Sequence, residues 1–369
     1  MVGDELKQAE DAISSAADGD RLLGPQQGGL ALSTGSTLLN LACTGSVGGG
    51  FVLGKFYLLV GDASAGKTFL AMSCLAEACI DPDFEAHRLI YDNIEDGCLL
   101  NLGALFSEEL EDRVEPPRMG DDGPIYSSTI EEFYFNLDDA VESKRPFIYV
   151  LDSMDALTAE ADNEKFKKLK KASRTNTEVA GSYGMAKAKL NSEGLRRAVS
   201  SLRGSNSILI ILCQTRDNLG FGFAEKTRAG GRALKFYATV EIWAAIRKTI
   251  KKNIRGKNRQ VGVKVLWKVK KNRITGLLHD VEFDIYPSFG IDDIGSCVDY
   301  LISEGHWKSR GNKIQAEDFG LCASRERIIS QIESGGLGDQ VRELVGECWD
   351  AIESDGRLKR KNRYKVTLT

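Results

Sequence analysis

The sequence predicts an α/β fold with a mostly parallel central sheet, and two observations carry this prediction. Short apolar runs alternate with segments of helical periodicity between residues 33 and 290. These runs are continuously apolar, as strands are when helices cover both faces of a parallel sheet. A length of 369 residues accommodates one large domain of this kind and one smaller domain.

The predicted elements follow one another in a regular order. A strand over residues 56–60 leads through a glycine-rich turn into a helix over 69–80. Three further apolar runs predict strands, at residues 88–91, 147–151 and 208–212. The proline-rich run 116–124 predicts a loop, and residues 185–202 predict a helix. Runs 261–269 and 279–285 predict the last strands of the core.

Three segments are expected along the chain. Residues 1–32 are polar and alanine-rich, which predicts a short helix followed by a linker. Residues 33–290 form the predicted core. From residue 291 the pattern changes to short amphipathic helices and turns, which predicts a small α+β domain over 291–369 with a basic tail at 357–365.

The composition excludes several classes of protein. The longest apolar runs, such as 208–212, are far shorter than the roughly 20 residues that a membrane span needs. The N-terminus is acidic and has no apolar segment, which argues against a signal peptide. Eight cysteines without a C-x-x-C pair, beside three histidines, argue against zinc and indicate a reducing compartment. We therefore expect a cytoplasmic protein without a membrane partner.

The turn after the first predicted strand fits the pattern G-x-x-x-x-G-K-[ST]. Glycine lets successive backbone N–H groups surround a phosphate at the N-terminus of the following helix. The lysine then bridges the outer phosphates, and the hydroxyl holds Mg²⁺. Because the pattern lies between a predicted strand and a predicted helix, it predicts binding of ATP with Mg²⁺. Its residues are Gly61, Asp62, Ala63, Ser64, Ala65, Gly66, Lys67 and Thr68.

Polar side chains at the ends of the other predicted strands complete the expected site. Asp152 ends the third strand, where an aspartate reaches the Mg²⁺ shell. Asp92, Glu95 and Asp96 follow the second strand, and the residues alone leave open which of them activates water. Gln214 follows the fourth strand and is either a sensor of the γ-phosphate or an ordinary loop residue.

The order of these segments resembles that of the RecA-family recombinases, and is more similar to the bacterial and phage branch than to the archaeal and eukaryotic one. The resemblance covers roughly residues 33–315. The segment AGGRALKFYATVEIW is the most specific part, since a phosphate loop alone does not require it. The other matching segments are STGS, GKFYLLVGDASAGKT, LDSMDALT, ILIILCQTR and KVKKNRI.

The resemblance implies a RecA-like core and an ATP-dependent protein that forms filaments on single-stranded DNA and pairs it with double-stranded DNA. Glu95 would be the catalytic carboxylate, although one extra residue relative to the family's usual spacing keeps Asp92 and Asp96 as alternatives. Gln214 would couple the γ-phosphate to DNA binding. Lys271 and Arg273 match positions that reach the ATP of the neighbouring subunit. Residues 1–32 would include a polymerisation segment.

The resemblance also places two DNA-binding loops. The second loop spans residues 215–232, where aromatic side chains are expected between bases and cations on phosphates. The first loop falls within residues 159–184 and is unusually rich in lysine. The expected DNA contacts are Arg216, Phe221, Phe223, Lys226, Arg228 and Arg232 in the second loop and Lys167, Lys168 and Arg174 in the first.

The charge distribution supports a nucleic-acid partner although the net charge is −4. Residues 247–273 contain twelve Lys and Arg and no Asp or Glu. Such a run is either a solvated face or a surface for an anionic partner, and its length favours the partner. We expect a DNA-dependent ATPase that acts in a bacterial cell or a phage-infected bacterium, with a single-strand-binding protein and mediators as further partners. The alternatives are a hexameric helicase with the same core and a non-catalytic recombinase paralogue.

Overall fold

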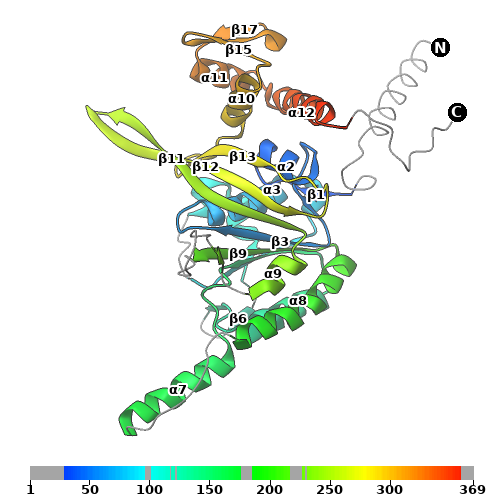
Figure 1. Ribbon diagram of the computed structural model, residues 1–369, viewed down its shortest axis with the longest axis vertical. Coiled ribbons are helices and arrows are strands. Elements are labelled where there is room, and N and C mark those ends of the chain that lie inside the picture. The colour runs from blue at the N-terminus through cyan, green and yellow to red at the C-terminus, as the bar shows by residue number, and fades with distance from the viewer. Residues whose placement is uncertain are drawn as a thin grey trace, which may run out of the picture. The chain divides into compact units, whose positions relative to one another are not determined.

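The computed structural model of the chain describes residues 29–95, 101–116, 118–120, 123–175, 185–216, 227–228 and 231–358. They belong to two compact units, one ending at Asp293 and the other beginning at Ile294. The first unit contains a ten-stranded sheet, and the second contains a three-stranded antiparallel sheet. The predicted α/β fold with a mostly parallel sheet is confirmed (Figure 1).

The first half of unit 1 carries the strands and helices around the phosphate loop. Its strands are β1 (Ala31–Leu32), β2 (Phe51–Val52), β3 (Lys55–Gly61), β4 (Arg88–Asn93), β5 (Val114–Glu115), β6 (Arg118–Gly120), β7 (Gly123–Ile125) and β8 (Phe147–Asp152). Its helices are α2 (Thr37–Thr44), α3 (Lys67–Ile80), the 3₁₀ turn η1 (Pro82–Phe84), α4 (Leu102–Leu105), α5 (Glu108–Arg113) and α6 (Ile130–Glu142).

The second half of unit 1 adds the remaining strands of the large sheet. Its helices are α7 (Glu160–Thr175), α8 (Met185–Ser205) and α9 (Gly231–Tyr237). Its strands are β9 (Ile208–Arg216), β10 (Thr227–Arg228), β11 (Val240–Ile254), β12 (Lys257–Asn272), β13 (Asp280–Tyr286) and β14 (Gly290–Ile291).

The order of strands in the large sheet brings four carboxyl ends together. The path runs β14-β13-β12-β11-β3-β9-β8-β4-β5, with β10 attached to β9. The strands from β11 to β5 are parallel, whereas β11 to β14 pair antiparallel. Because β3, β9, β8 and β4 are neighbours that point the same way, the residues after them meet at one edge of the sheet.

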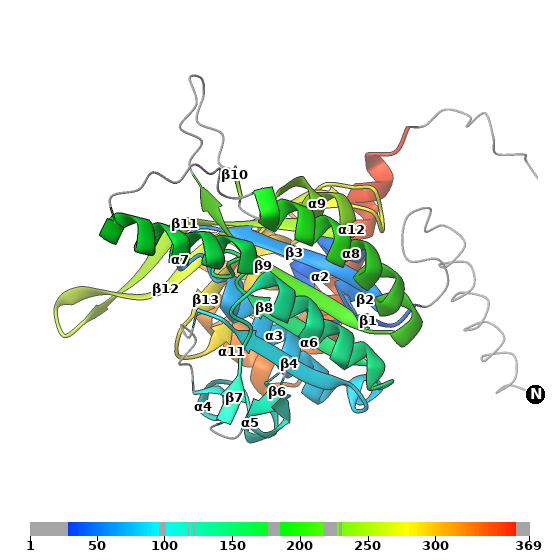
Figure 2. The same ribbon diagram turned by 90° about the horizontal axis from the view of Figure 1, so that it is seen from below.

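Both faces of the parallel strands are covered by helices. Phe56, Leu58 and Val60 of β3 point toward α6 and α8 and join the apolar core there. The alternate residues Tyr57 and Leu59 are equally buried on the other face, where α3 packs against β3, β8 and β9. Figure 2 shows α6 and α8 on the near side of the sheet. This double burial explains why the strands are continuously apolar.

Three segments differ from the sequence-based expectation. The run 116–124 is not simply a loop, because β6 and β7 pair antiparallel within it. The lysine-rich part of 159–183 lies on helix α7, on which Phe166 is exposed. Strand β12 is longer than the predicted run 261–269, and it forms one extended hairpin with β11, which was not predicted as a strand. Residues 1–28, including the expected polymerisation segment, lie outside the described residues.

The described residues of unit 2 form three helices and a small sheet. The unit contains α10 (Asp293–Ser303), β15 (Lys308–Arg310), β16 (Lys313–Ala316), the 3₁₀ turn η2 (Glu317–Phe319), β17 (Leu321–Ala323), α11 (Arg325–Ser334) and α12 (Gly338–Asp355). Its core includes the buried Trp307, Ile328 and Val345. Arg325 at the start of α11 donates from Nε and Nη2 to the carboxylate of Asp299 on α10, at 2.6 and 3.0 Å. None of the described helices is long and apolar enough to cross a lipid bilayer.

His87 is a buried titratable group at the start of β4, and it makes the stability of unit 1 depend on pH. Its ring packs against that of Phe84 in a tilted arrangement, its Nε2 lies 3.3 Å from the carbonyl oxygen of Asn206, and burial lowers its pKa below the ordinary value. The unfolded chain therefore binds a proton more readily. As pH falls below about 6.5, the free energy of unfolding should decrease by up to about 1.4 kcal/mol per pH unit.

Replacing His87 tests this dependence. In His87→Gln the decrease in unfolding free energy between pH 7 and pH 5.5 should be shallower than in the unmodified protein, as measured by urea denaturation at each pH. His279→Gln, at a half-buried histidine just before β13, is the matched control. Equal pH slopes in the His87 variant and the unmodified protein would contradict the assignment.

Candidate active site

The phosphate loop connects the end of β3 to the start of α3 and requires glycine at two positions. Gly66 has a φ of +85°, and a Cβ atom there would lie 2.7 Å from Cδ1 of Ile285. A Cβ atom on Gly61 would lie 2.7 Å from the carbonyl oxygen of Ala244 on the neighbouring strand β11. The loop therefore packs closely against β11 and β13, and its backbone is left free to face the cavity beyond it.

Lys67 is the first residue of α3, and its ammonium group bends back onto the loop. It donates to the carbonyl oxygens of Gly61 and Asp62 at 2.9 and 2.8 Å. Burial lowers the pKa of Lys67, and the nearby Asp152 and Glu95 oppose this shift. A buried ammonium group beside a loop of this size can neutralise the negative charge of the outer phosphates of a nucleotide.

Asp152 ends β8 beside the first turn of α3. Its Oδ2 accepts hydrogen bonds from Thr68 Oγ1 at 2.7 Å and from Tyr91 Oη at 3.1 Å. Burial raises the pKa of Asp152, whereas these two hydroxyl groups and Lys67 act in the opposite direction. The carboxylate is thus held in place by two neighbouring elements and is 7 % exposed.

The residues present fit a magnesium ion. The Thr68 hydroxyl and the Asp152 carboxylate are hard oxygen donors 2.7 Å apart. Mg²⁺ prefers this chemistry with only one or two protein ligands, because water and phosphate oxygens supply the rest. Within the described part of the chain, no cluster of three or more His, Cys, Asp or Glu residues forms a separate metal site.

The three acidic candidates at the end of β4 and just after it have different surroundings. Glu95 lies at the site, where its Oε1 accepts hydrogen bonds from Ser153 Oγ and, at 3.1 Å, from Gln214 Nε2. Asp92 is fully buried, and its carboxylate accepts from the backbone N–H and hydroxyl of Ser127 and from the hydroxyl of Tyr149. Asp92 therefore has a structural role, because its hydrogen bonds connect β4 to Ser127 and to Tyr149 on β8. It does not line the cavity. Asp96 lies outside the described residues.

Strand β9 connects the site to the second predicted loop. The backbone N–H of Gln214 donates to Asp155 Oδ2 at 2.7 Å, which fixes the end of the strand. The next residue, Thr215, donates from its hydroxyl to Oδ1 of Asp62 in the phosphate loop. Two consecutive residues of β9 thus contact the carboxylate at Glu95 and the phosphate loop.

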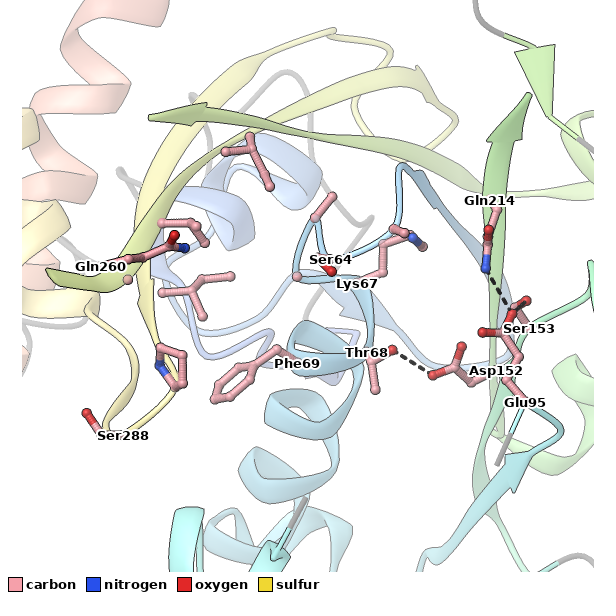
Figure 3. Close-up of a pocket in the computed structure, with 18 of the residues that line it drawn as sticks. Ser64, Lys67, Thr68, Phe69, Glu95, Asp152, Ser153, Gln214, Gln260 and Ser288 are labelled. Atoms are coloured by element: carbon pink, nitrogen blue, oxygen red, sulfur yellow. Dashed lines mark hydrogen bonds between the residues drawn. The ribbon is translucent and has the colours of Figure 1, made fainter. Parts of the chain in front are cut away.

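These residues border one cavity of about 1000 Å³. Lys67, Thr68, Glu95, Asp152 and Gln214 lie on one side of the cavity, and Phe69, Gln260 and Ser288 lie on the other (Figure 3). The second side also includes apolar side chains of β11, β12, β13 and the segment after β13, namely Ile246, Val261, Val263, Ile285 and Pro287. A charged end beside an apolar end matches the phosphates and the base of a nucleotide.

Lys271 and Arg273 do not line this cavity. The ammonium group of Lys271 donates to the carbonyl oxygens of Lys235, Phe236 and Ala238, at the C-terminus of α9. The guanidinium of Arg273 lies 5.7 Å from the ring centre of Phe236. Both side chains therefore lie together beside α9.

The expected DNA-binding residues lie on several elements. Lys167 and Lys168 are exposed on α7, which also carries Arg174. Arg216 and Arg228 belong to the paired strands β9 and β10, and Arg232 is exposed on α9. Phe221, Phe223 and Lys226 lie outside the described residues.

Sequence reasoning missed three side chains of the site. Tyr91, Ser153 and Thr215 each donate a hydrogen bond to a predicted site residue. Tyr91 lies inside a predicted strand, where an aromatic residue is expected for packing. Ser153 and Thr215 directly follow predicted site positions, so adjacency to Asp152 and Gln214 was the available signal.

The fold and the site define the class of protein. A phosphate loop after the central strand, with polar side chains at the ends of three neighbouring parallel strands, is the arrangement of a P-loop nucleotide-binding protein.

Comparisons with known proteins find that the chain is similar to RecA proteins. The family model of the RecA N-terminal domain matches residues 137–292. The chain is 29 % identical over 365 residues to Protein RecA of Caulobacter sp. strain K31, covering 96 % of this chain and 94 % of the relative. It is 28 % identical over 331 residues to Protein RecA of Thermus thermophilus, covering 89 % and 88 % of the two chains. These similarities agree with the resemblance to RecA-family recombinases that the order of the motifs indicated.

The hydroxyl of Thr68 provides a direct test of the magnesium site. Thr68→Ala removes one of the two oxygen donors, so the gain in nucleotide affinity on adding Mg²⁺ should fall by about tenfold or more. Thr68→Ser keeps the hydroxyl and should retain the gain. The measurement is titration with a fluorescent ATP analogue, with and without Mg²⁺. The site would be wrongly assigned if Thr68→Ala responded to Mg²⁺ as the unmodified protein does.

Proposed function

We propose that this chain is an ATP-dependent DNA recombinase that forms filaments on single-stranded DNA and promotes homologous pairing and strand exchange. The observation that carries the proposal is the end of β9, where Gln214 contacts Glu95 and Thr215 contacts Asp62. The same strand leads directly into the segment in which the second DNA-binding loop is proposed. Nucleotide state and DNA contact are therefore linked through one short stretch of chain.

The chemistry at the site follows from the positions of its side chains. Backbone N–H groups of the phosphate loop and the ammonium of Lys67 would bind the phosphates of ATP. Thr68 and Asp152 would hold Mg²⁺, which when bound neutralises charge on the phosphate oxygens. Glu95 would accept a proton from the attacking water or orient it, and the hydrogen bonds from Ser153 and Gln214 fix the position of its carboxylate.

We propose that Gln214 couples binding of the γ-phosphate to the position of the second DNA-binding loop. Its side-chain amide donates to Glu95 at 3.1 Å, and its backbone is tied to Asp155. An oxygen of the γ-phosphate would compete with Glu95 for this amide. A change of partner at Gln214 would then shift the start of the loop, which begins one or two residues later.

Lys271 and Arg273 are proposed to act on the ATP of a neighbouring subunit. They lie beside α9 and away from the cavity of their own chain, so they require a second copy to reach a phosphate. Cations supplied in this way would stabilise charge that develops on the γ-phosphate. ATP between subunits would thereby favour the filament, and hydrolysis would weaken it.

The proposed DNA contacts are the cations and aromatic residues predicted in the two loops, with Lys167, Lys168 and Arg174 on α7 and Arg216, Phe221, Phe223, Lys226, Arg228 and Arg232 in the second loop. The relatives named above are bacterial, so we expect action in the cytoplasm of a bacterium or of a phage-infected bacterium. A single-strand-binding protein and mediator proteins are expected to assist.

Electron microscopy with single-stranded DNA tests the assembly. Helical filaments should form with a slowly hydrolysed ATP analogue and should be lost in Lys67→Ala, which removes the phosphate-binding ammonium. Joint molecules should then appear when homologous duplex DNA is added to the filaments. Closed hexameric rings would instead support a helicase, and absence of filaments under every nucleotide would support a non-catalytic paralogue.

Substitution of the acids identifies the catalytic carboxylate. Glu95→Gln should lower DNA-stimulated ATP turnover by about 10²- to 10⁴-fold while nucleotide binding changes little, because only the group that handles water is lost. Asp96→Asn is the matched comparison and should keep most of the turnover. Asp92→Asn should lower the melting temperature, since Asp92 joins three buried hydrogen bonds. Loss of turnover in Asp96→Asn with activity retained in Glu95→Gln would transfer the role to Asp96.

A further inference from the structure

The hairpin formed by β11 and β12 extends beyond the sheet. Strand β13 pairs with β12 only as far as Val263, opposite Ile285. From Lys251 to Arg259 the two strands pair only with each other, and every residue of this segment is exposed (Figure 1). We refer to residues 251–259 as the hairpin arm.

The arm ends in a tight turn that holds its two strands together. Arg255 and Gly256 have φ values of +53° and +75°, and they connect the opposed residues Ile254 and Lys257. Positive φ at both central positions gives a turn whose twist matches that of the strands. The arm is therefore a regular two-stranded ribbon with defined faces.

Three cations at the base of the hairpin are paired with acids, whereas those of the arm are not. Lys264 lies 2.8 Å from Asp284, and Arg247 lies 2.9 Å from Glu282. Lys268 likewise pairs with Asp280, so β13 supplies all three carboxylates. Beyond the end of β13, these carboxylates no longer neutralise the cations of the hairpin. In the part of the chain that the structure describes, no carboxylate forms an ion pair with the five arm cations, which are Lys251, Lys252, Arg255, Lys257 and Arg259.

Most of this charge lies on one face of the arm. Lys252 is directly opposite Arg259, and Lys257 is two residues from Arg259 on the same strand, so the three side chains share a face. The other face carries Lys251 with the uncharged Asn253 and Asn258. Like charges in a directly opposed pair destabilise a hairpin. The pair Lys252 and Arg259 therefore costs stability unless an anion lies against it.

The geometry of this face fits a phosphodiester backbone. Residues two apart on a strand are about 6.7 Å apart, which is about twice the distance that each successive phosphate of one DNA strand advances along the helix axis. A two-stranded ribbon also has a width that the major groove of duplex DNA admits. An acidic protein partner is less favoured, because a stable protein interface has an apolar centre and Ile254 is the only apolar residue of the arm.

We propose that the hairpin arm is a binding element for the phosphodiester backbone of nucleic acid, formed by Lys252, Lys257 and Arg259. It is separate in sequence and in fold from the two loops assigned above. The arm also joins the nucleotide cavity, since the residue after Arg259 is Gln260, which lines that cavity. This inference deepens the proposed function and rests on it, because it assumes that the chain binds DNA.

The test compares how DNA binding depends on salt. The full chain and a triple variant, Lys252→Gln, Lys257→Gln and Arg259→Gln, are titrated without nucleotide against a fluorescent 30-mer of dT and a fluorescent 30-base-pair duplex at several salt concentrations. Each lost phosphate contact lowers the slope of log K against log salt by about 0.9 on duplex and about 0.7 on single strands. The slope should fall by about 2 to 3 on the duplex if the arm binds duplex, and by about 2 on dT if it binds single strands.

Two control variants separate the arm from charge in general. Lys144→Gln, Arg145→Gln and Arg203→Gln together remove three exposed cations at the opposite edge of the sheet and should leave both slopes unchanged. Lys252→Arg, Lys257→Arg and Arg259→Lys keep the arm's charge and should restore the full slope. Circular dichroism and thermal melting confirm that each variant is folded.

The outcomes distinguish the arm from the function on which it rests. If the slopes are unchanged in the folded triple variant while the unmodified chain binds DNA normally, the arm does not bind the phosphodiester backbone. The proposed function then remains intact. Unchanged slopes together with altered self-association in sedimentation velocity also contradict nucleic-acid binding by the arm. They would indicate that the arm binds an acidic face of a second copy of the chain. If the unmodified chain binds neither DNA, the proposed function fails first.

Discussion

The structure depends on four neighbouring strands that run in the same direction and end at one edge of the sheet. Strands β4, β8, β9 and β3 are buried on both faces, so their positions are set by packing over their whole length. The polar residues that follow them have no freedom to separate. The site is therefore assembled by the sheet. The hydrogen bond from Thr68 to Asp152 connects α3, which follows β3, to the end of β8.

This arrangement also explains why hydroxyl groups surround the acids. Asp152 is desolvated at the end of β8, and its carboxylate would be costly to keep charged without donors. Thr68 and Tyr91 supply them from α3 and β4, and Ser153 supplies one to Glu95. Each donor comes from an element adjacent to the acid. The packing that buries Asp152 thus provides the hydroxyl groups that orient it, and Glu95, which is exposed, is oriented by the residue next to Asp152.

Acidic and basic residues are concentrated on different segments of this protein. The net charge of −4 averages over an acidic N-terminus and several strongly basic segments. Along the hairpin, three cations near the sheet form ion pairs with Asp280, Glu282 and Asp284 of β13. Those farther out extend past the last residue of β13. The difference between a structural ion pair and a cationic surface is therefore set by the length of one strand.

The sequence by itself determined the order of the buried parallel strands β3, β4, β8 and β9 and the chemistry of the loop at residues 61–68. Continuous apolar runs require burial on both faces, and a glycine pattern between a strand and a helix has few other uses, so these local features were sufficient. The same reasoning placed Asp152, Glu95 and Gln214 at strand ends.

Only the tertiary structure decided which of these residues touch. Asp92 and Glu95 are three positions apart and look alike in sequence, yet one is buried against Ser127 and Tyr149 and the other faces the cavity. Likewise, the run 247–273 is uniformly basic in sequence, but its neighbours in space divide it into paired and unpaired cations. The physical reason is that strand pairing brings together residues far apart in the chain, and their contacts decide burial, hydrogen bonding and charge.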